Sequence, residues 1–265
     1  MSESHGVITG GMTSGRSTTF DTPQFNASYT AQAGYRLADA MNAATFGSAQ
    51  LTSDSTSTNS NGTVLFSNIA GSTENYLALY QATTYSSSVK GSGYTAARYG
   101  GVGGWQHTIV SGSLRQTRLD YFAYGTATPL TAMPHTGQVK YSLSTSGNYA
   151  TNTDLWFLSG SSGNAITIDF AAGTVSGNIS LSGQNFYKSQ VGGIGYLPLK
   201  GTINGNSITG SILNGDLGTS GSVPTQFRIL FIGPNANELV ISFVANDGSQ
   251  AAVGSSIGII DPFFQ

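Results

Sequence analysis

Two adjacent stretches, Ile166-Thr-Ile-Asp-Phe170 and Thr174-Val-Ser-Gly-Asn-Ile-Ser-Leu181, decide the fold of this chain. Apolar residues alternate with polar ones in both, and the short segment Ala171-Ala172-Gly173 separates them. Because successive side chains of a strand point to opposite faces, a period of two predicts a strand with one buried face. We therefore expect a β-hairpin whose apolar face contributes to a core.

The same alternation recurs along the second half of the chain. It begins at residues 139–143 and continues in arms that flank turns at residues 204–206, 233–237 and 246–248. Residues 154–158 either extend the first hairpin or form a strand of their own, which makes seven or eight strands. Short strands joined by tight turns form an up-and-down antiparallel sheet, and such a sheet hides its edges best by closing on itself. We predict an eight-stranded antiparallel up-and-down β-barrel whose inward side chains just fill the interior.

The composition also favours strands. The 265 residues include 36 glycines, 13 tyrosines and 13 phenylalanines, and only 8% are charged. Glycine, serine, threonine and asparagine suit turns and solvent-facing strand positions and disfavour long helices. The aromatic content distinguishes the chain from a disordered one. The predicted fold class is therefore mainly all-β.

Charge and cysteine usage exclude several classes of function. A formal net charge of −2 argues against a nucleic-acid partner, which would need a clustered basic surface. The absence of cysteine excludes disulfides, thiolate catalysis and cysteine zinc sites. No apolar run approaches the roughly 20 residues that a membrane-spanning helix needs.

The chain divides into three predicted parts. Residues 1–18 are polar and rich in glycine and serine, which predicts a flexible leader. Residues 19–128 are expected to form a β-rich domain with a short helix, called the handle domain below. Two prolines at Pro129 and Pro134 mark the boundary, because proline pushes its predecessor to extended geometry, and residues 129–265 form the predicted barrel domain.

Two segments of the handle domain have a specific expectation. Residues 32–46 contain several helix formers with apolar residues at helical spacing, so they are the candidate for the short helix. Residues 90–104 contain six glycines and are expected to form a loop or a series of tight bends.

The same part of the handle domain combines aromatic and cationic residues. This mixture suits a flat anionic ligand or a contact with a protein partner, because rings and guanidinium groups supply much of the binding energy in such sites. The alternative is that the aromatic residues are core and the cations are solvated. The candidate ligand-binding residues are Tyr94, Arg98, Tyr99, Trp105, His107, Arg115 and Arg118.

No constellation typical of an enzyme or a metal site is evident. The three histidines, His5, His107 and His135, lack the spacing of metal ligands, and no nucleophile elbow, zinc-protease or phosphate-loop motif occurs. Asp169 lies at an outward strand position, and Glu238 lies in a turn where it can accept backbone N–H groups. We therefore expect no catalytic residue, no metal and no cofactor.

Three ordered stretches resemble the barrel lobe of transferrin-binding protein B and similar bacterial lipoproteins. The first runs from Asp120-Tyr-Phe-Ala-Tyr-Gly-Thr-Ala-Thr-Pro129 through Met133-Pro134 to Gly137-Gln-Val-Lys-Tyr141. The second combines residues 166–170 with Gly173-Thr-Val-Ser-Gly-Asn-Ile179, and the third is Phe231-Ile-Gly-Pro-Asn-Ala-Asn-Glu-Leu239. The resemblance covers the C-terminal half well and the N-terminal half poorly, and it departs from the family pattern at residues 253–258. No segment matches a transferrin-contacting one, so transferrin itself is not implied.

The resemblance implies a ligand-binding lipoprotein on the cell surface, attached to the outer membrane by a lipid anchor upstream of these 265 residues. Such a protein captures a nutrient, either a small molecule or a carrier protein, and delivers it to a TonB-dependent outer-membrane transporter. It would be a monomer and would contact the membrane only through the anchor. An adhesion or host-interaction protein without a transport role is the alternative, and a surface-attached enzyme is the third.

Overall fold

The computed structural model describes most of the chain, and it is nearly all β. The described residues are 2–9, 16–20, 26–30, 34–38, 42–47, 50–53, 63–80, 83–88, 91–112, 114–151, 153–160, 164–213, 226–246 and 249–262. The mainly all-β fold class is confirmed.

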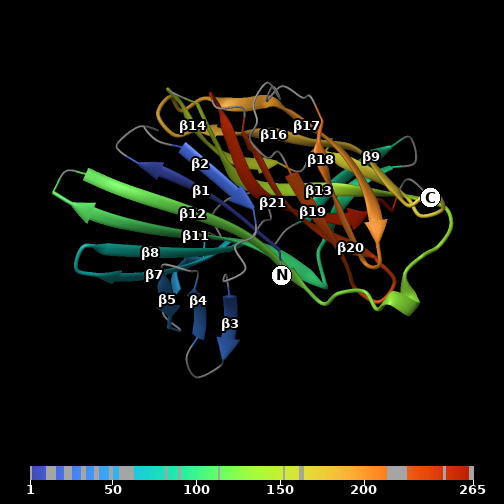
Figure 1. Ribbon diagram of the computed structural model, residues 1–265, viewed down its shortest axis with the longest axis horizontal. Helices are drawn as coiled ribbons and strands as arrows, with labels where there is room; N and C mark the ends of the chain where they lie inside the picture. The colour runs from blue at the N-terminus through green and yellow to red at the C-terminus, as the bar shows by residue number, and fades with distance from the viewer. Residues whose placement is uncertain are drawn as a thin grey trace.

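The second half of the chain forms a closed antiparallel barrel (Figure 1). The last strand pairs back with the first, from Tyr141 opposite Ile260 to Ala150 opposite Ala251, and this pairing closes the sheet. Two short strands, β14 and β15, both pair with β13 and with β16, so they share one of eight positions around the barrel. The strands are β13 (Gln138–Ala150), β14 (Leu155–Gly160), β15 (Ala165–Asp169), β16 (Thr174–Asn185), β17 (Val191–Asn204), β18 (Ser207–Ile212), β19 (Gln226–Ile232), β20 (Glu238–Asn246) and β21 (Ala251–Ile260).

A buried asparagine supports the break between β14 and β15. The carbonyl of Asn164 accepts the N–H of Leu143 at 2.7 Å. Its side-chain Nδ2 donates to Thr145 Oγ1 at 3.0 Å, and its Oδ1 accepts the N–H of Ser180 at 3.0 Å. One residue thus replaces the missing ladder contacts to both neighbouring strands. Residues 155–160 are therefore a strand of their own, as one of the two predicted alternatives had it.

The inward row of the barrel is a packed core, as the alternation predicted. Tyr141, Ile166, Ile168, Val175 and Ile179 are all buried in one cluster. The hydroxyl of Tyr141 donates to the carbonyl of Ala236 at 2.6 Å, and burial raises the pKa of Tyr141. The group therefore remains a protonated donor inside the barrel.

The first half of the chain forms three smaller sheets (Figure 1). A seven-stranded sheet has the order β2-β1-β12-β11-β8-β7-β6. Its strands are β1 (Ser2–Thr9), β2 (Arg16–Phe20), β6 (Gln50–Ser53), β7 (Thr63–Ala70), β8 (Thr73–Tyr80), β11 (Gly100–Ser111) and β12 (Leu114–Gly125). The others are β3 (Asn26–Thr30), β4 (Gly34–Ala38) and β5 (Ala43–Phe46) in one sheet, and β9 (Thr83–Ser88) with β10 (Gly91–Ala96) in another. Residues 126–137 join the two domains and are called the connector below; they contain the one 3-10 turn among the described residues, η1 (Leu130–Ala132).

One face of the seven-stranded sheet packs on the outside of the barrel. Val102 and Ala123 contact Val240 and Ile257 in a buried cluster, and the Tyr121 hydroxyl donates to Asn148 Oδ1 on β13. Because this contact covers the outer wall, β20 and β21 are buried on both faces over nearly their whole length. Double-sided burial explains the apolar run of β20, which only Ser242 interrupts, and the small buried residues of β21.

The prediction of a helix at residues 32–46 is wrong. Residues 34–38 and 43–46 are strands β4 and β5, whereas residues 32, 33 and 39–41 lie outside the described part of the chain. Leu37 and Phe46 are fully buried against Trp105 and Phe122 of the larger sheet. Burial against that sheet outweighs the helix propensity of these residues, which amounts to only a few tenths of a kcal/mol each.

The prediction of a flexible leader at residues 1–18 is also wrong for the residues that the structure describes. Residues 2–9 form β1, which pairs with β12 from Ser2 opposite Ala123 to Thr9 opposite Gln116, and residues 16–20 form β2. Strand pairing uses backbone N–H and C=O groups, so a composition rich in glycine and serine does not prevent it.

The glycine-rich segment consists mainly of two strands, joined by residues 97–99, rather than of a loop. Residue 90 lies outside the described part, but residues 91–96 form β10 and β11 begins at Gly100. On β12, the ring of Phe122 lies over its cross-strand partner Gly103, where an added Cβ would be 2.4 Å from Cζ. The Tyr124 ring covers Gly101 in the same way. The glycines therefore provide space for aromatic rings on the neighbouring strand.

Candidate functional site

Two of the seven predicted ligand-binding residues are buried structural residues. Trp105 is 1% exposed, lies in the core between the sheets and donates from Nε1 to Asn75 Oδ1 at 3.1 Å. Arg118 is also buried, and its Nε donates to Asp120 Oδ1 at 3.1 Å. Both side chains are occupied inside the handle domain.

His107 and Arg115 lie toward the far end of the same sheet. His107 is directly opposite Arg118, and its Nδ1 is 2.8 Å from Asn75 Oδ1. Arg115 is exposed and forms an ion pair with Glu74, at 2.8 Å between Nη1 and Oε2. The structure therefore brings Trp105, His107 and Arg118 together on one face but separates them from Arg115.

The other three predicted residues are exposed. Tyr94 on β10 is 67% exposed, and its ring centroid lies 5.0 Å from that of Tyr85. Arg98 and Tyr99 follow β10, and their backbone N–H groups donate to the carboxylate of Glu238 at 2.7 and 3.0 Å. The predicted role of Glu238 as an acceptor of backbone N–H groups is confirmed, and the donors come from the handle domain.

Asp169, the other carboxylate named from the sequence, also has a structural role. It accepts the N–H of Ala172 at 2.8 Å and a hydrogen bond from Gln138 Nε2 at 2.8 Å. The Ala172 N–H and then Gln138 lower the pKa of Asp169 below its ordinary value. Asp169 is therefore the ionised cap of the β15–β16 turn.

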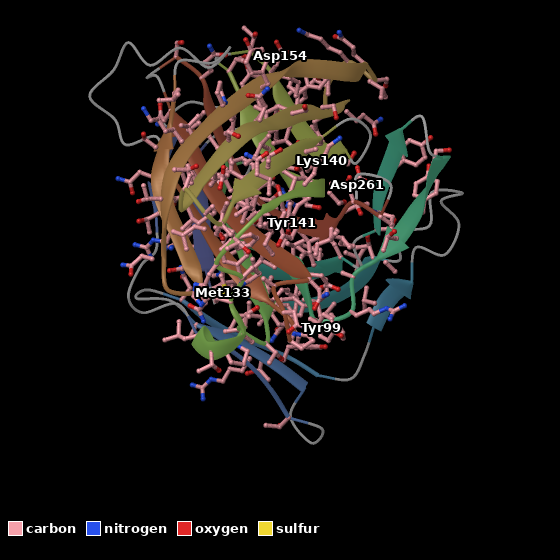
Figure 2. All side chains as sticks on the ribbon, turned by 90° about the vertical axis from the view of Figure 1, so that its right-hand side faces the viewer. Tyr99, Met133, Lys140, Tyr141, Asp154 and Asp261 are labelled. Carbon is pink, nitrogen blue, oxygen red and sulfur yellow. The ribbon has the colours of Figure 1, made fainter. Side chains whose placement is uncertain are left out.

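The two ends of the barrel carry different turns and contacts. One end, called the connector end, carries the β17–β18 and β19–β20 turns and is covered by the connector. There, Asn206 Nδ2 donates to the carbonyl of Thr128 at 2.9 Å, and the N–H of Gly233 donates to that of Thr126 at 2.9 Å. The opposite end, called the open end, carries the β13–β14 and β16–β17 turns, with Asp154 (Figure 2).

Three exposed aromatic residues contact one another at the open end. Phe157, Phe186 and Tyr187 are 45%, 59% and 41% exposed. The Phe186 ring lies 5.4 Å from the Phe157 ring and 5.1 Å from the Tyr187 ring, edge-on in both pairs. We call these three residues the open-end aromatic cluster. Exposed aromatic residues in mutual contact are typical of binding surfaces.

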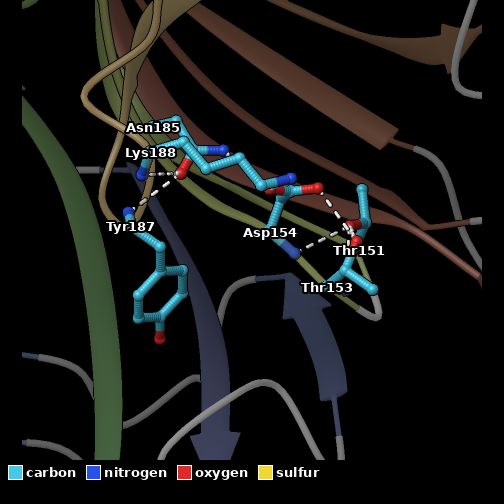
Figure 3. Close-up of polar contacts among 6 residues, drawn as sticks. All are labelled: Thr151, Thr153, Asp154, Asn185, Tyr187 and Lys188. Atoms are coloured by element: carbon cyan, nitrogen blue, oxygen red, sulfur yellow. Dashed lines mark hydrogen bonds and ion pairs between the residues drawn. The ribbon is translucent and has the colours of Figure 1, made fainter.

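A buried asparagine holds the turn that carries the cluster (Figure 3). Asn185 Oδ1 accepts the N–H groups of Tyr187 and Lys188 at 2.9 and 3.0 Å, and its Nδ2 donates to Asp154 Oδ1 at 2.8 Å. The N–H of Phe186 donates to the carbonyl of Leu155 at 2.7 Å. These bonds fix the β16–β17 turn against β14, so the aromatic rings stand on a rigid support.

The charges beside the cluster neutralise each other. Lys188 Nζ lies 2.5 Å from Asp154 Oδ1. The bond to Lys188 first, and those to Asn185 and Thr153, lower the pKa of Asp154 to about 2. The Asp154 carboxylate is therefore ionised at neutral pH, and its ion pair with Lys188 adds no net charge to the surface.

The carboxyl group of Asp154 is expected to titrate near pH 2 rather than near its ordinary value of 3.8. Because the folded-state pKa is depressed, the stabilisation from this network is complete above about pH 4 and is lost as the pH falls toward 2. Carboxyl-carbon NMR would measure the midpoint. The Lys188→Gln variant should titrate at higher pH, and an unshifted midpoint in the parent protein would contradict the network.

Sequence reasoning missed the open-end cluster, although two signals were present. Phe157 stands at the outward position between Trp156 and Leu158, which are both buried. Phe186 and Tyr187 occupy a turn, where polar residues are the norm. An apolar residue at an outward strand position, beside a turn with two aromatic residues, is typical of a surface that binds another molecule.

The described residues contain no group of three or more histidine, aspartate and glutamate side chains that could hold a metal ion. No helix among them is long and apolar enough to cross a membrane.

Comparison with known proteins places the barrel in a family. Residues 133–258 match the family described as the C-lobe and N-lobe β-barrels of transferrin-binding protein B. No curated protein matches the chain. Among solved structures, the chain is similar to intact Ap-TbpB with its N and C lobes, with a TM-score of 0.51 and 16% identity. The alignment covers 98% of this chain and 46% of that protein, so the chain spans less than half of its length.

Two further solved structures are more distant. The N-lobe domain of lactoferrin-binding protein B of Moraxella bovis has a TM-score of 0.36 at 15% identity, with 97% of this chain and 99% of that chain covered. HpuA from Kingella denitrificans, solved in complex with human haemoglobin, has a TM-score of 0.36 at 15% identity, with 91% of each chain covered.

Proposed function

Because residues 133–258 of this chain are a β-barrel of the transferrin-binding protein B family, we propose that the chain captures a nutrient-carrying protein at the bacterial cell surface. In this proposal it is a lipid-anchored, non-enzymatic protein of the outer membrane, and it passes its cargo to a TonB-dependent transporter in the same membrane. The similarity of the fold to intact Ap-TbpB supports the assignment.

The open-end aromatic cluster is the observation that carries this proposal. Aromatic side chains provide a large contact area with few rotatable bonds, and they dominate the energetics of protein interfaces. The rigid turn held by Asn185 lowers the entropy lost when a partner binds. The connector covers the opposite end of the barrel, whereas the three rings of the cluster are exposed.

A protein cargo fits this surface better than a small molecule. The barrel interior is packed with large buried side chains, among them Tyr141, Phe231 and Phe243, as expected for eight strands. The cluster, in contrast, lies on the outside, where its rings can enter a hydrophobic depression of a partner. The paired charges of Asp154 and Lys188 supply a polar rim without net charge.

The double variant Phe157→Ser and Phe186→Ser is expected to lose at least about 2 kcal/mol of binding energy, because it removes two of the three exposed rings. Transferrin, lactoferrin and haemoglobin, immobilised separately, form the test panel in surface plasmon resonance. The parent protein should bind one of them, and the melting temperature of the variant should equal that of the parent.

Tyr94→Ser is the matched control, because Tyr94 is an exposed aromatic residue on β10 outside the cluster. It should bind like the parent. Binding of the parent to none of the three proteins would reject the capture of these carriers. Full binding by the double variant would place the capture site elsewhere.

A further inference from the structure

Beyond cargo capture at the open end, we propose a second docking surface at the connector end of the barrel. It consists of the exposed side chains of Arg98 and Tyr99, called the Arg98–Tyr99 corner, and Glu238 is its positioning residue. The partner is a protein surface that presents a carboxylate beside apolar side chains.

A buried carboxylate is used to hold this corner. Glu238 is only 3% exposed, and both of its oxygens accept main-chain N–H groups, from Arg98 at 2.7 Å and from Tyr99 at 3.0 Å. Removing a carboxylate from water costs several kcal/mol unless hydrogen bonds compensate. Because main-chain N–H groups occupy both oxygens of Glu238, this carboxylate does not pair with the guanidinium of Arg98, which can bind a partner. The barrel thus orders two exposed handle residues.

The ring and the backbone of Tyr99 are fixed from the other side. The ring lies against Gly233, where an added Cβ would be 2.7 Å from Tyr99 Cδ2, and Gly233 has a φ of +83°. The carbonyl of Tyr99 accepts the N–H of Thr126 at 3.1 Å. The corner is therefore preorganised, and ordering it costs little when a partner binds.

The charges at this end favour an acidic partner. The carboxylates of Asp169 and Asp261 are already engaged, by the Ala172 N–H and by Lys140 Nζ at 3.7 Å respectively. Within the described part of the chain, Arg98 forms no ion pair. A guanidinium group binds a carboxylate through two parallel hydrogen bonds, which fits this exposed cation.

An exposed apolar residue lies at the same end of the barrel. Leu130 in the connector is 63% exposed, and its side chain lies next to the β17–β18 turn, 3.1 Å from where a Cβ of Gly205 would be. Tyr99 packs on the β19–β20 turn, whereas Asp154 lies in the β13–β14 turn at the opposite end of the strands, and Figure 2 shows Tyr99 and Met133 well apart from Asp154. Because the two surfaces lie at opposite ends, the protein can hold the acidic partner and a cargo at the same time.

Nuclear magnetic resonance of the full 15N-labelled chain tests this corner with a defined probe. The probe is a synthetic peptide that alternates leucine with glutamate, and the comparison is the same peptide with glutamine in place of glutamate. The glutamate peptide should shift the amide signals of Arg98, Tyr99 and Leu130, and its binding should weaken as salt is added. The glutamine peptide should bind at least about tenfold more weakly.

Variants separate the charge from the positioning. Arg98→Gln should abolish the shifts, whereas Arg115→Gln, which changes an exposed arginine on the far end of the handle sheet, should not. Glu238→Gln should weaken peptide binding and speed hydrogen exchange at the amides of Arg98 and Tyr99, because an amide offers one acceptor oxygen where the carboxylate offers two. Equal shifts from both peptides, shifts that persist in Arg98→Gln, or parental binding by Glu238→Gln would overturn the proposal.

Discussion

Trp105→Ala is expected to lower the free energy of unfolding by about 3–5 kcal/mol, the usual cost of removing a large buried aromatic side chain. Trp105 is fully buried between Leu77 and Phe122 of its own sheet and Leu37 and Phe46 of the small sheet, so the substitution leaves a cavity between two layers. Urea unfolding followed by far-ultraviolet circular dichroism would measure the change.

Tyr94→Ala is the control for Trp105→Ala, since Tyr94 is mostly exposed and should change stability by no more than about 0.5 kcal/mol. The comparison also decides between the two interpretations that the sequence left open for Trp105. A stable Trp105→Ala variant that has lost binding would make Trp105 a ligand contact. A strongly destabilised variant would make it core.

Gly103→Val is expected to destabilise the protein by about 1–3 kcal/mol, although valine has a higher strand propensity than glycine. Propensity alone is worth no more than about 1 kcal/mol in favour of valine. A Cβ at position 103, however, would lie 2.4 Å from Cζ of Phe122, a buried ring that cannot move aside without disturbing the core. The steric term therefore outweighs the propensity.

The matched control is Gly192→Val on β17, where an added Cβ meets no atom within 4 Å. This variant should be as stable as the parent or slightly more stable. A double-mutant cycle adds Phe122→Leu, which should recover part of the stability lost in Gly103→Val. If the changes in the free energy of unfolding from the two substitutions are purely additive, the valine side chain does not clash with the Phe122 ring.

The barrel could be predicted because its signals are local. Alternation at residues 166–170 and 174–181 specifies one buried face on each arm, and the turn between them joins the arms. The interior row that follows from this period is the observed core. The sequence also predicted that Glu238 accepts backbone N–H groups, but its donors, Arg98 and Tyr99, are 140 and 139 residues away in the chain, and no local signal identifies them.

The handle domain could not be predicted in the same way, because its elements depend on residues far away in the chain. The strands β4 and β5 exist through burial against Trp105, about 60 residues later, which outweighs their helix propensity. Strand β1 forms because its backbone pairs with the edge of β12. The glycines of β11 predict a loop when the sequence is considered alone. Their role as space for the aromatic rings of β12 is evident only in the folded structure.

The sequence by itself determined the all-β class and the barrel, since a period of two and tight turns are properties of neighbouring residues, and its ordered motifs gave the resemblance to a known family. Only the tertiary structure decided where the candidate residues lie. Among the seven candidate residues, it buried Trp105 and Arg118 because their positions on β11 and β12 face the small sheet. It also assembled Phe157 with Phe186 and Tyr187, which are separated in the chain by β15 and β16. Strand pairing brings such residues together, and the register that does so is set by the closure of the whole barrel.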